Sequence, residues 1–398
     1  MNINMQSVSI ADIKNNNITE FDTDDKLSLY CYDSCTNNST NVQKVSRGVV
    51  FEGDKLVFQG LPYTDEYVVK DGDDYGIKNF DKTTFYKSYE GCLLRVFYHG
   101  DKWYKATHHK LDADKSKWGC TKSYGQIFSE LIDWEEIEGK LDKECGYLFL
   151  MENNQDNRLV CRALENPNVW HVGTIKNCAL DVDDDIGVKK PQKISFKNVD
   201  DMNRYIREMD FMEYQGIIAF KEDGMQTKIY NDEYKKFLDT RGNENSIRFR
   251  YIQVRMDHDR RERLKYLYPS FVKDFEQYEN ILDIITDFIY KSYVERFIYK
   301  QFKRTPKDEY KIIQLAHTWH LSDRDRNKIS MDKIRSLLNE QSPVYLNRII
   351  KRLKKFGNYD NYNGAPKFQT TQPNVYAADP SIKPVESVPD KEVVVSES

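Results

Sequence analysis

Long apolar runs are missing from this sequence of 398 residues, and none approaches the roughly 18 residues that a membrane-spanning helix needs. The first residues show no basic start followed by an apolar core, so we expect no signal peptide. A strong charge is also missing, because 60 basic residues nearly balance 64 acidic ones. We therefore expect a soluble protein with no membrane partner, in which any nucleic-acid contact depends on local basic patches.

Paired cysteines are scarce as well. The seven cysteines are odd in number and scattered along the chain, which is typical of reduced thiols in a cytoplasmic protein. Cys31 and Cys35 form the one close pair, without the second pair or neighbouring His that a four-ligand zinc site requires. The sequence therefore does not favour a zinc site.

The pattern of residues changes along the chain and predicts its domains. Residues 1–40 are rich in Asn, Asp, Ser and Thr and indicate a leader, whereas 41–255 interleave strand and helix patterns. Residues 256–357 have helical periodicity, and 358–398 lack periodicity, which predicts a disordered tail. We expect an α+β domain with mixed antiparallel sheets, then an all-helical C-terminal domain and the tail, in a monomer.

The stretch from residue 85 to 110 is the most informative. Apolar residues alternate over 92–97, Gly100-Asp101 can turn the chain, and 103–107 return, which predicts a β-hairpin. The polar segment Ser88-Tyr89-Glu90-Gly91 stands just before its first strand. The same patterns predict a helix over 123–137 and buried strands at 146–151, 158–161, 170–175, 217–220 and 226–230.

The segment before the hairpin resembles the Lys-x-Asp/Glu-Gly signature of RNA ligases, DNA ligases and capping enzymes, in which the Lys forms a covalent nucleotide adduct. The resemblance is closest to phage-type RNA ligases, and extends to RNA-ligase-like proteins of large DNA viruses. It covers roughly residues 40–245 and implies a nucleotidyltransferase (ATP-grasp-like ligase) domain. Its nucleotide-binding residues would be Arg47, Glu90, Gly91, Glu152 and Lys228.

Further family patterns follow in the expected order. Arg47-Gly48 resembles an upstream phosphate-binding pair, Thr107-His108 resembles the end of the hairpin, and Glu152 precedes Asn157-Arg158-Leu159-Val160. Gln215-Gly216 stands where the family has a metal-binding Glu-Gly, so the implied metal ligands are Glu152 and a weakened Gln215. Lys228-Ile229-Tyr230 stands in place of Lys-x-Lys.

The departures from the family pattern concern chemistry. Ser88 occupies the place of the nucleophilic Lys and cannot form a phosphoramidate. Gln215 removes a carboxylate that would hold Mg²⁺, and Tyr230 removes a positive charge. The resemblance therefore predicts a pseudoenzyme that binds a nucleotide or RNA ends, with no cofactor required.

An active enzyme is the alternative. Lys87 is adjacent to the vacant position but should point to the opposite face of its strand, and Lys105 lies on the returning strand. With either Lys as surrogate nucleophile, the chain would be an RNA-repair ligase that uses ATP and Mg²⁺. A weaker alternative is an mRNA capping guanylyltransferase.

Two basic segments are candidates for contact with RNA. Lys115 and Lys117 precede the predicted helix at 123, and Arg348, Lys351, Arg352 and Lys355 crowd the last helix. Clustered Lys and Arg bind nucleic-acid backbones by releasing counterions. The competing interpretation of both segments is a solvated surface.

Overall fold

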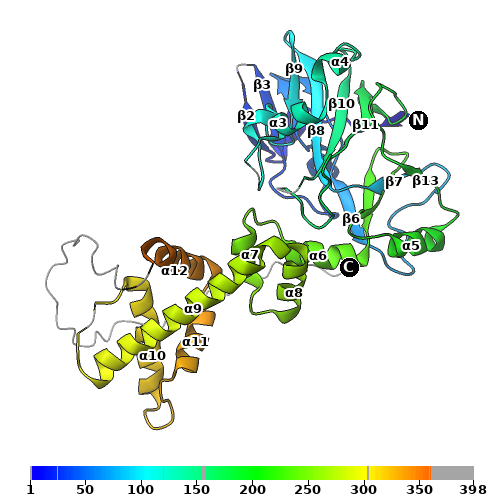
Figure 1. Ribbon diagram of the computed structural model, residues 1–398. Helices are drawn as coiled ribbons and strands as arrows, with labels where there is room; N and C mark the ends of the chain where they lie inside the picture. Colours follow the sequence, from blue (N-terminus) through cyan, green and yellow to red (C-terminus); the bar gives the residue numbers. More distant parts are fainter. Residues whose placement is uncertain are drawn as a thin grey trace.

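The computed structural model describes residues 2–357 except 25, 120, 155, 156 and 303, together with residue 359. Three sheets form one end of the molecule, and the helices that follow them extend away to the other end (Figure 1). This arrangement confirms the predicted α+β class with antiparallel sheets and a helical C-terminal region. Apart from Tyr359, the predicted tail at 358–398 lies outside the described residues.

Each sheet joins strands that are distant in sequence. The six-stranded sheet has the order β1 (Asn2–Asn4), β12 (Ala179–Asp181), β11 (Val169–Lys176), β10 (Gly146–Glu152), β8 (Gly91–His99) and β9 (Lys102–Ala106). The five-stranded sheet has the order β13 (Lys193–Ile194), β7 (Thr84–Ser88), β14 (Gly216–Phe220), β15 (Gln226–Tyr230) and β6 (Thr64–Val68). The four-stranded sheet has the order β2 (Thr19–Thr23), β3 (Leu27–Cys31), β4 (Val49–Glu52) and β5 (Lys55–Phe58).

Helices occur both before and after β15, and the three longest of those described follow it. The first group comprises α1 (Ile10–Asn15), α2 (Asn41–Val45), η1 (Ala113–Lys115), α3 (Tyr124–Leu131), α4 (Trp134–Glu138) and α5 (Val199–Glu208). The second comprises α6 (Asp232–Arg241), α7 (Ile247–Val254), α8 (His258–Leu267), η2 (Pro269–Phe271), α9 (Val272–Tyr293), η3 (Val294–Ile298), α10 (Lys307–Ser322), α11 (Met331–Asn339) and α12 (Pro343–Phe356).

The central hairpin forms as its alternation predicts. Strands β8 and β9 pair with Phe97 opposite Tyr104, and Gly100 and Asp101 both have positive φ in the turn between them. Positive φ at both turn residues matches the right-handed twist of the flanking strands. Strand β10 pairs with the other edge of β8, so the hairpin becomes part of the six-stranded sheet.

Three regions differ from the prediction. Residues 1–40 supply β1, β2 and β3, because few but well-spaced apolar residues such as Ile3 are buried on pairing. The predicted helix at 123–137 is divided into α3 and α4, because the Asp133 side chain accepts a hydrogen bond from the Glu136 amide and caps a new helix. Residues 158–161 are not a strand in the described structure.

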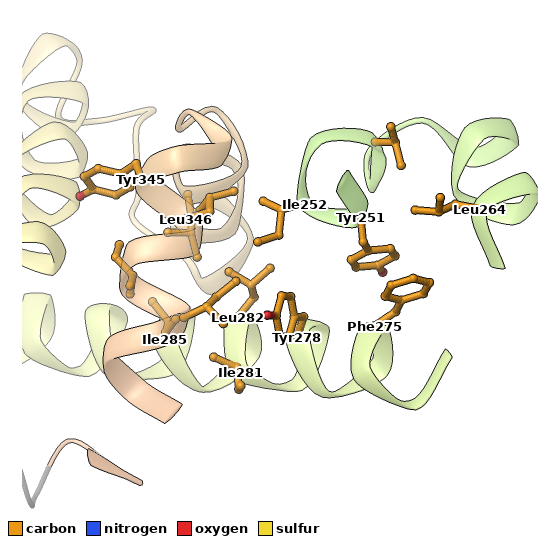
Figure 2. Close-up of a cluster of buried hydrophobic side chains, with 14 of the residues drawn as sticks. Tyr251, Ile252, Leu264, Phe275, Tyr278, Ile281, Leu282, Ile285, Tyr345 and Leu346 are labelled. Carbon is orange, nitrogen blue, oxygen red and sulfur yellow. The ribbon is translucent and has the colours of Figure 1, made fainter. Parts of the chain in front are cut away.

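The helices after β15 share one buried cluster of apolar side chains. Tyr251 and Ile252 of α7, Leu282 and Ile285 of α9, and Leu346 of α12 point into it (Figure 2). The cluster also includes Tyr230 and Tyr234, so the change to helical packing begins before the predicted boundary at residue 256. Of the helices in the described part of the chain, none has the length and apolar character that a membrane span requires.

Candidate functional site

A cavity of about 340 Å³ lies between the five-stranded and six-stranded sheets. Ser88, Gln215 and Lys228 come from the first sheet and its approach, and Gly91, Leu93 and Arg95 of β8 come from the second. Arg47, which precedes β4, and His108, which follows β9, complete the polar part of the wall. The structure thus brings together most of the patterns that the sequence singled out.

A chain of hydrogen bonds starts at Ser88. Its hydroxyl donates to Gln215 Oε1 at 3.0 Å, and the Lys228 ammonium donates to the same oxygen at 3.0 Å. Gln215 Nε2 donates to the Tyr234 hydroxyl at 2.8 Å, which donates to Glu90 Oε2 at 2.8 Å. Burial and then the Glu90 carboxylate raise the pKa of Tyr234, so Tyr234 stays a donor. Ser88 is therefore held by an amide oxygen, with no basic group on its hydroxyl.

The pairing of strands creates this arrangement. Ser88 of β7 is opposite Gly216 of β14, so Gln215 lies beside Ser88, and its amide donates to the Ser88 carbonyl at 2.9 Å. A Cβ at Gly216 would lie 2.1 Å from the carbonyl oxygen of Ile229, which explains the glycine at that position. The Gln-Gly pattern thus has a structural reason that does not depend on metal binding.

Glu90 is 4% exposed, and its carboxylate is used within the protein. Oε1 accepts from the Leu159 amide at 2.6 Å and from Asn153 Nδ2 at 2.8 Å. Oε2 accepts from the amides of Val160 at 2.9 Å and Cys161 at 3.2 Å. If residues 158–161 formed the expected strand, a neighbouring strand would accept hydrogen bonds from their amides, and the Glu90 carboxylate accepts these bonds instead. Glu90 therefore holds this loop and does not line the cavity of about 340 Å³.

The lysines divide clearly by position. Lys228 lines the cavity, and burial lowers its pKa. Lys87 also belongs to the wall, but its ammonium lies 4.2 Å from the centre of the Tyr214 ring. The Lys105 ammonium lies 4.0 Å from the centre of the Trp134 ring and is not part of the cavity wall. Each of the two predicted surrogates thus has its ammonium over an aromatic ring.

The predicted metal ligands are separated. Glu152 Oε2 accepts from the amide and the side chain of Asn168, at 3.0 and 2.7 Å, and borders a neighbouring cavity of about 580 Å³. Gln215 borders the first cavity, where its oxygen already accepts from an ammonium. In the described part of the chain, no three His, Cys, Asp or Glu side chains gather as metal ligands would.

The two basic segments differ in what their cations contact. Lys117 is exposed on the loop before α3, whose Tyr124 lines the cavity, and Lys115 is exposed at the end of η1 with its ammonium 4.0 Å from Asp112. On α12, Arg348 and Arg352 form ion pairs with Asp308, at 2.6 and 2.7 Å. Lys351 and Lys355 of the same helix are exposed, at the opposite end of the molecule from β7 and β8 (Figure 1).

Arg95 is a cavity residue that the sequence patterns did not reveal. Its side chain is 1% exposed, and its Nη2 donates to the Arg47 carbonyl at 3.2 Å. Burial, and then the charge of Arg47, lower the pKa of Arg95 to about 10. Burial and the Arg95 charge lower the pKa of His108 to about 2, so its ring is neutral. The signal that could have revealed Arg95 was a charged residue at an inward-facing position of the alternating strand 92–97.

The chain is similar to viral immediate-early proteins. It is 30% identical over 297 residues to an immediate-early protein ICP-46 homolog of Invertebrate iridescent virus 3, covering 71% of this chain and 65% of that protein. It is 26% identical over 365 residues to the homolog of Invertebrate iridescent virus 6, covering 82% and 80%. For the immediate-early protein ICP-46 of Frog virus 3 (isolate Goorha) the identity is 26% over 265 residues, covering 60% and 65%.

Other comparisons are weaker. No family model matches the chain. A putative ATP-dependent DNA ligase from Aquifex aeolicus aligns with a TM-score of 0.41 at 11% identity, over 68% of this chain and 79% of that one. An archaeal ATP-dependent RNA ligase aligns with a TM-score of 0.43 at 12% identity, over 68% and 78%. These scores are too low to carry an argument about function.

Proposed function

We propose that the chain binds a nucleotide, or the phosphorylated end of an RNA, in the cavity between its sheets without forming a covalent bond to it. The observation that carries this proposal is the meeting of distant patterns. Arg47, Gly91 and Lys228 are far apart in sequence, resemble ligase motifs in the same order, and line one cavity. Arg47 and Lys228 supply positive charge, which suits a phosphorylated ligand.

The absence of a nucleophile at position 88 supports binding without covalent transfer. A hydroxyl needs an adjacent base to attack phosphorus, and the Ser88 hydroxyl instead donates to an amide oxygen. Mg²⁺ prefers carboxylate oxygens, whereas the Gln215 oxygen is neutral and faces the Lys228 ammonium. The groups at this position therefore favour holding a phosphate and not transferring it.

RNA can approach the cavity past the loop before α3. The Tyr124 amide donates to the Ser116 carbonyl at 2.8 Å, which fixes the exposed Lys115 and Lys117 beside a residue of the cavity wall. Exposed cations in this position suit the backbone of a strand whose end enters the cavity. By contrast, Arg348 and Arg352 are occupied by carboxylates.

One experiment distinguishes non-covalent binding of a nucleotide from its covalent transfer to the protein. The protein is incubated with ATP or GTP labelled at the α-phosphate, with Mg²⁺ or Mn²⁺, and is analysed by filter binding and on a denaturing gel. We expect retained label on the filter and no labelled band. Lys228→Met should weaken binding by about 10-fold, because a charge-assisted hydrogen bond is lost. Lys143→Met is the matched control, because the Lys143 ammonium also covers an aromatic ring, that of Tyr98, but is not part of the cavity wall.

An active ATP- and Mg²⁺-dependent RNA ligase is the second candidate, and one observation favours it. Lys228 lines the cavity, and burial lowers its pKa, which increases the fraction of neutral, nucleophilic amine. A labelled band that disappears in Lys228→Ala would establish this candidate and end the first proposal. A band with GTP alone would indicate a capping activity instead.

A further inference from the structure

Arg95 is a buried charge without a counter-ion. Within the described part of the chain, its buried Nε and Nη1 have no hydrogen-bond partner, and neither does the buried Nε of Arg47. Among the residues that the structure describes, no carboxylate forms an ion pair with either guanidinium. Taking a charge out of water costs several kcal/mol unless it is paired, and proteins ordinarily pair a buried Arg. The missing partner is therefore an observation that needs an explanation.

The surrounding backbone is shaped around this side chain. A Cβ at Gly60 would lie 2.8 Å from Arg95 Nε. A Cβ at Gly48 would lie 3.1 Å from Arg95 Nη1 and 2.8 Å from the His108 Cα, and φ at Gly48 is +68°. Both glycines thus make room for the guanidinium. Gly48 belongs to the Arg47-Gly48 pattern, which links that pattern to Arg95.

The groups around Arg95 indicate that a partner for it should carry negative charge. Arg47 is a second guanidinium on the same cavity, and Lys228 is an ammonium on the opposite sheet. His108 adds a neutral ring. Guanidinium groups present planar, paired donors that match the oxygens of a phosphate. A phosphate dianion that reaches the buried guanidinium of Arg95 would bind its unpaired donors and neutralise the two arginines.

We infer that Arg95, together with Arg47, forms a phosphate-binding subsite at the β8 side of the cavity. This inference rests on the proposed function and specifies its ligand chemistry, a phosphate group with two negative charges. Such a group is present at the end of the triphosphate of a nucleotide and at the 5′ end of a phosphorylated RNA. Arg95 has no part in a covalent step.

The first experiment measures thermal stability with inorganic phosphate and with pyrophosphate. The wild-type protein should gain several degrees with pyrophosphate, since a ligand that binds the folded state raises the melting temperature. Arg95→Met should melt at or above the wild-type temperature without ligand, because it removes an unpaired buried charge, and should lose the response.

The matched control is Arg241→Met. Arg241 is also buried, at 2% exposed, but it donates to the Tyr268 hydroxyl at 2.8 Å and to the Glu244 carbonyl at 2.6 Å. This variant should melt below the wild type and keep the response to pyrophosphate. Arg95→Lys, which keeps the charge without the paired donors, should fold and bind pyrophosphate on the order of 10-fold more weakly than the wild type.

The second experiment identifies the source of the phosphate. Binding of ATP, adenosine, and 5′-phosphorylated and 5′-hydroxyl RNA oligomers is measured for the wild type and Arg95→Lys. Loss of affinity for ATP alone assigns the subsite to the nucleotide triphosphate, and loss for the 5′-phosphorylated oligomer alone assigns it to the RNA end. Either loss supports the inference, and we expect it to be on the order of 10- to 100-fold.

Failure of the inference differs from failure of the proposed function. If Arg95→Met melts as low as Arg241→Met and still responds to pyrophosphate, Arg95 is a structural residue and the inference is overturned. If ATP and RNA bind equally to the wild type and Arg95→Lys, the inference also falls while the proposed function stands. If pyrophosphate binds through Arg95 but no nucleotide or RNA binds, the inference stands and the proposed function falls.

Discussion

At the cavity, the hydrogen bonds of single residues show which side chains are used to hold the fold. Ser88 and Gln215 are bonded to each other, so the side chain at each of these two positions constrains the other. Glu90 keeps the acidic residue of the pattern but uses it to bind the amides of Leu159, Val160 and Cys161. The Glu90 carboxylate therefore holds a loop of the fold, and it also borders the neighbouring cavity of about 580 Å³.

Buried histidines make stability depend on pH. Burial lowers the pKa of His108 to about 2 and that of His171 to about 4, whereas an unfolded His titrates near 6.5. Below about pH 6.5 the unfolded state therefore binds more protons, and the free energy of unfolding falls as pH falls. His108→Asn should reduce the loss between pH 6.5 and 5 by about 1.5 kcal/mol in urea titrations.

The exposed His258 provides the control for this prediction. His258→Asn should leave the loss of stability between the two pH values unchanged. If His108→Asn and the wild type lose equal stability, His108 is not held neutral in the folded protein.

Among the elements, α12 shows how a basic helix can be a packing element. Its apolar face, which includes Leu346 and Ile350, packs in the helical cluster. Arg352 contacts Asp308 and Glu309 at the start of α10, and Glu309 is 0% exposed. Arg348 and Arg352 thus join two helices, although Arg348 is also exposed, as are Lys351, Lys354 and Lys355.

Arg352→Met should lower the free energy of unfolding by about 3–5 kcal/mol, because it leaves the Glu309 carboxylate buried without its cation. Arg326→Met is the control, since Arg326 is exposed and 3.8 Å from Asp323, and should change it by less than about 0.5 kcal/mol. Chemical denaturation measures both. Equal effects would show that the ion pairs of α12 are as weak as surface pairs.

Across the whole molecule, the helical part is joined to the loop that Glu90 holds. Val160 and Cys161 of that loop are members of the buried helical cluster. The Tyr268 hydroxyl after α8 lies 3.0 and 2.8 Å from the carbonyl oxygens of Arg158 and Leu159. Loss of the helices would therefore expose part of the β-rich region.

This connection predicts that the two parts unfold together. Denaturation followed by helical circular dichroism and by tryptophan fluorescence should give coincident transitions. Tyr268→Phe should shift both transitions by the same amount, and Tyr299→Phe, at an exposed position, should shift neither. A helical signal lost at lower denaturant than the fluorescence would contradict a single cooperative unit.

Local patterns in the sequence were sufficient to predict those elements whose conformation depends on residues close together in the chain. The alternation over 92–97 and the turn at Gly100-Asp101 predicted β8 and β9, because side-chain period and turn geometry depend on neighbouring residues. The helical periodicity after residue 256 predicted the C-terminal helices for the same reason. The resemblance to ligase motifs pointed to Arg47, Gly91 and Lys228, which line the cavity, and to Glu90 and Glu152, which do not.

Tertiary structure alone decided what depends on partners distant in sequence. Within residues 1–40, β1 and β3 form because β12 and β4 offer edges to pair with. Residues 158–161 are a loop because one carboxylate binds its amides. The pairing of β7 with β14 set Gln215 against Ser88. The fold also left Arg95 buried beside Arg47 with no carboxylate from the described residues paired to it, because a counter-charge is supplied by whatever packs nearby and not by neighbours in the chain.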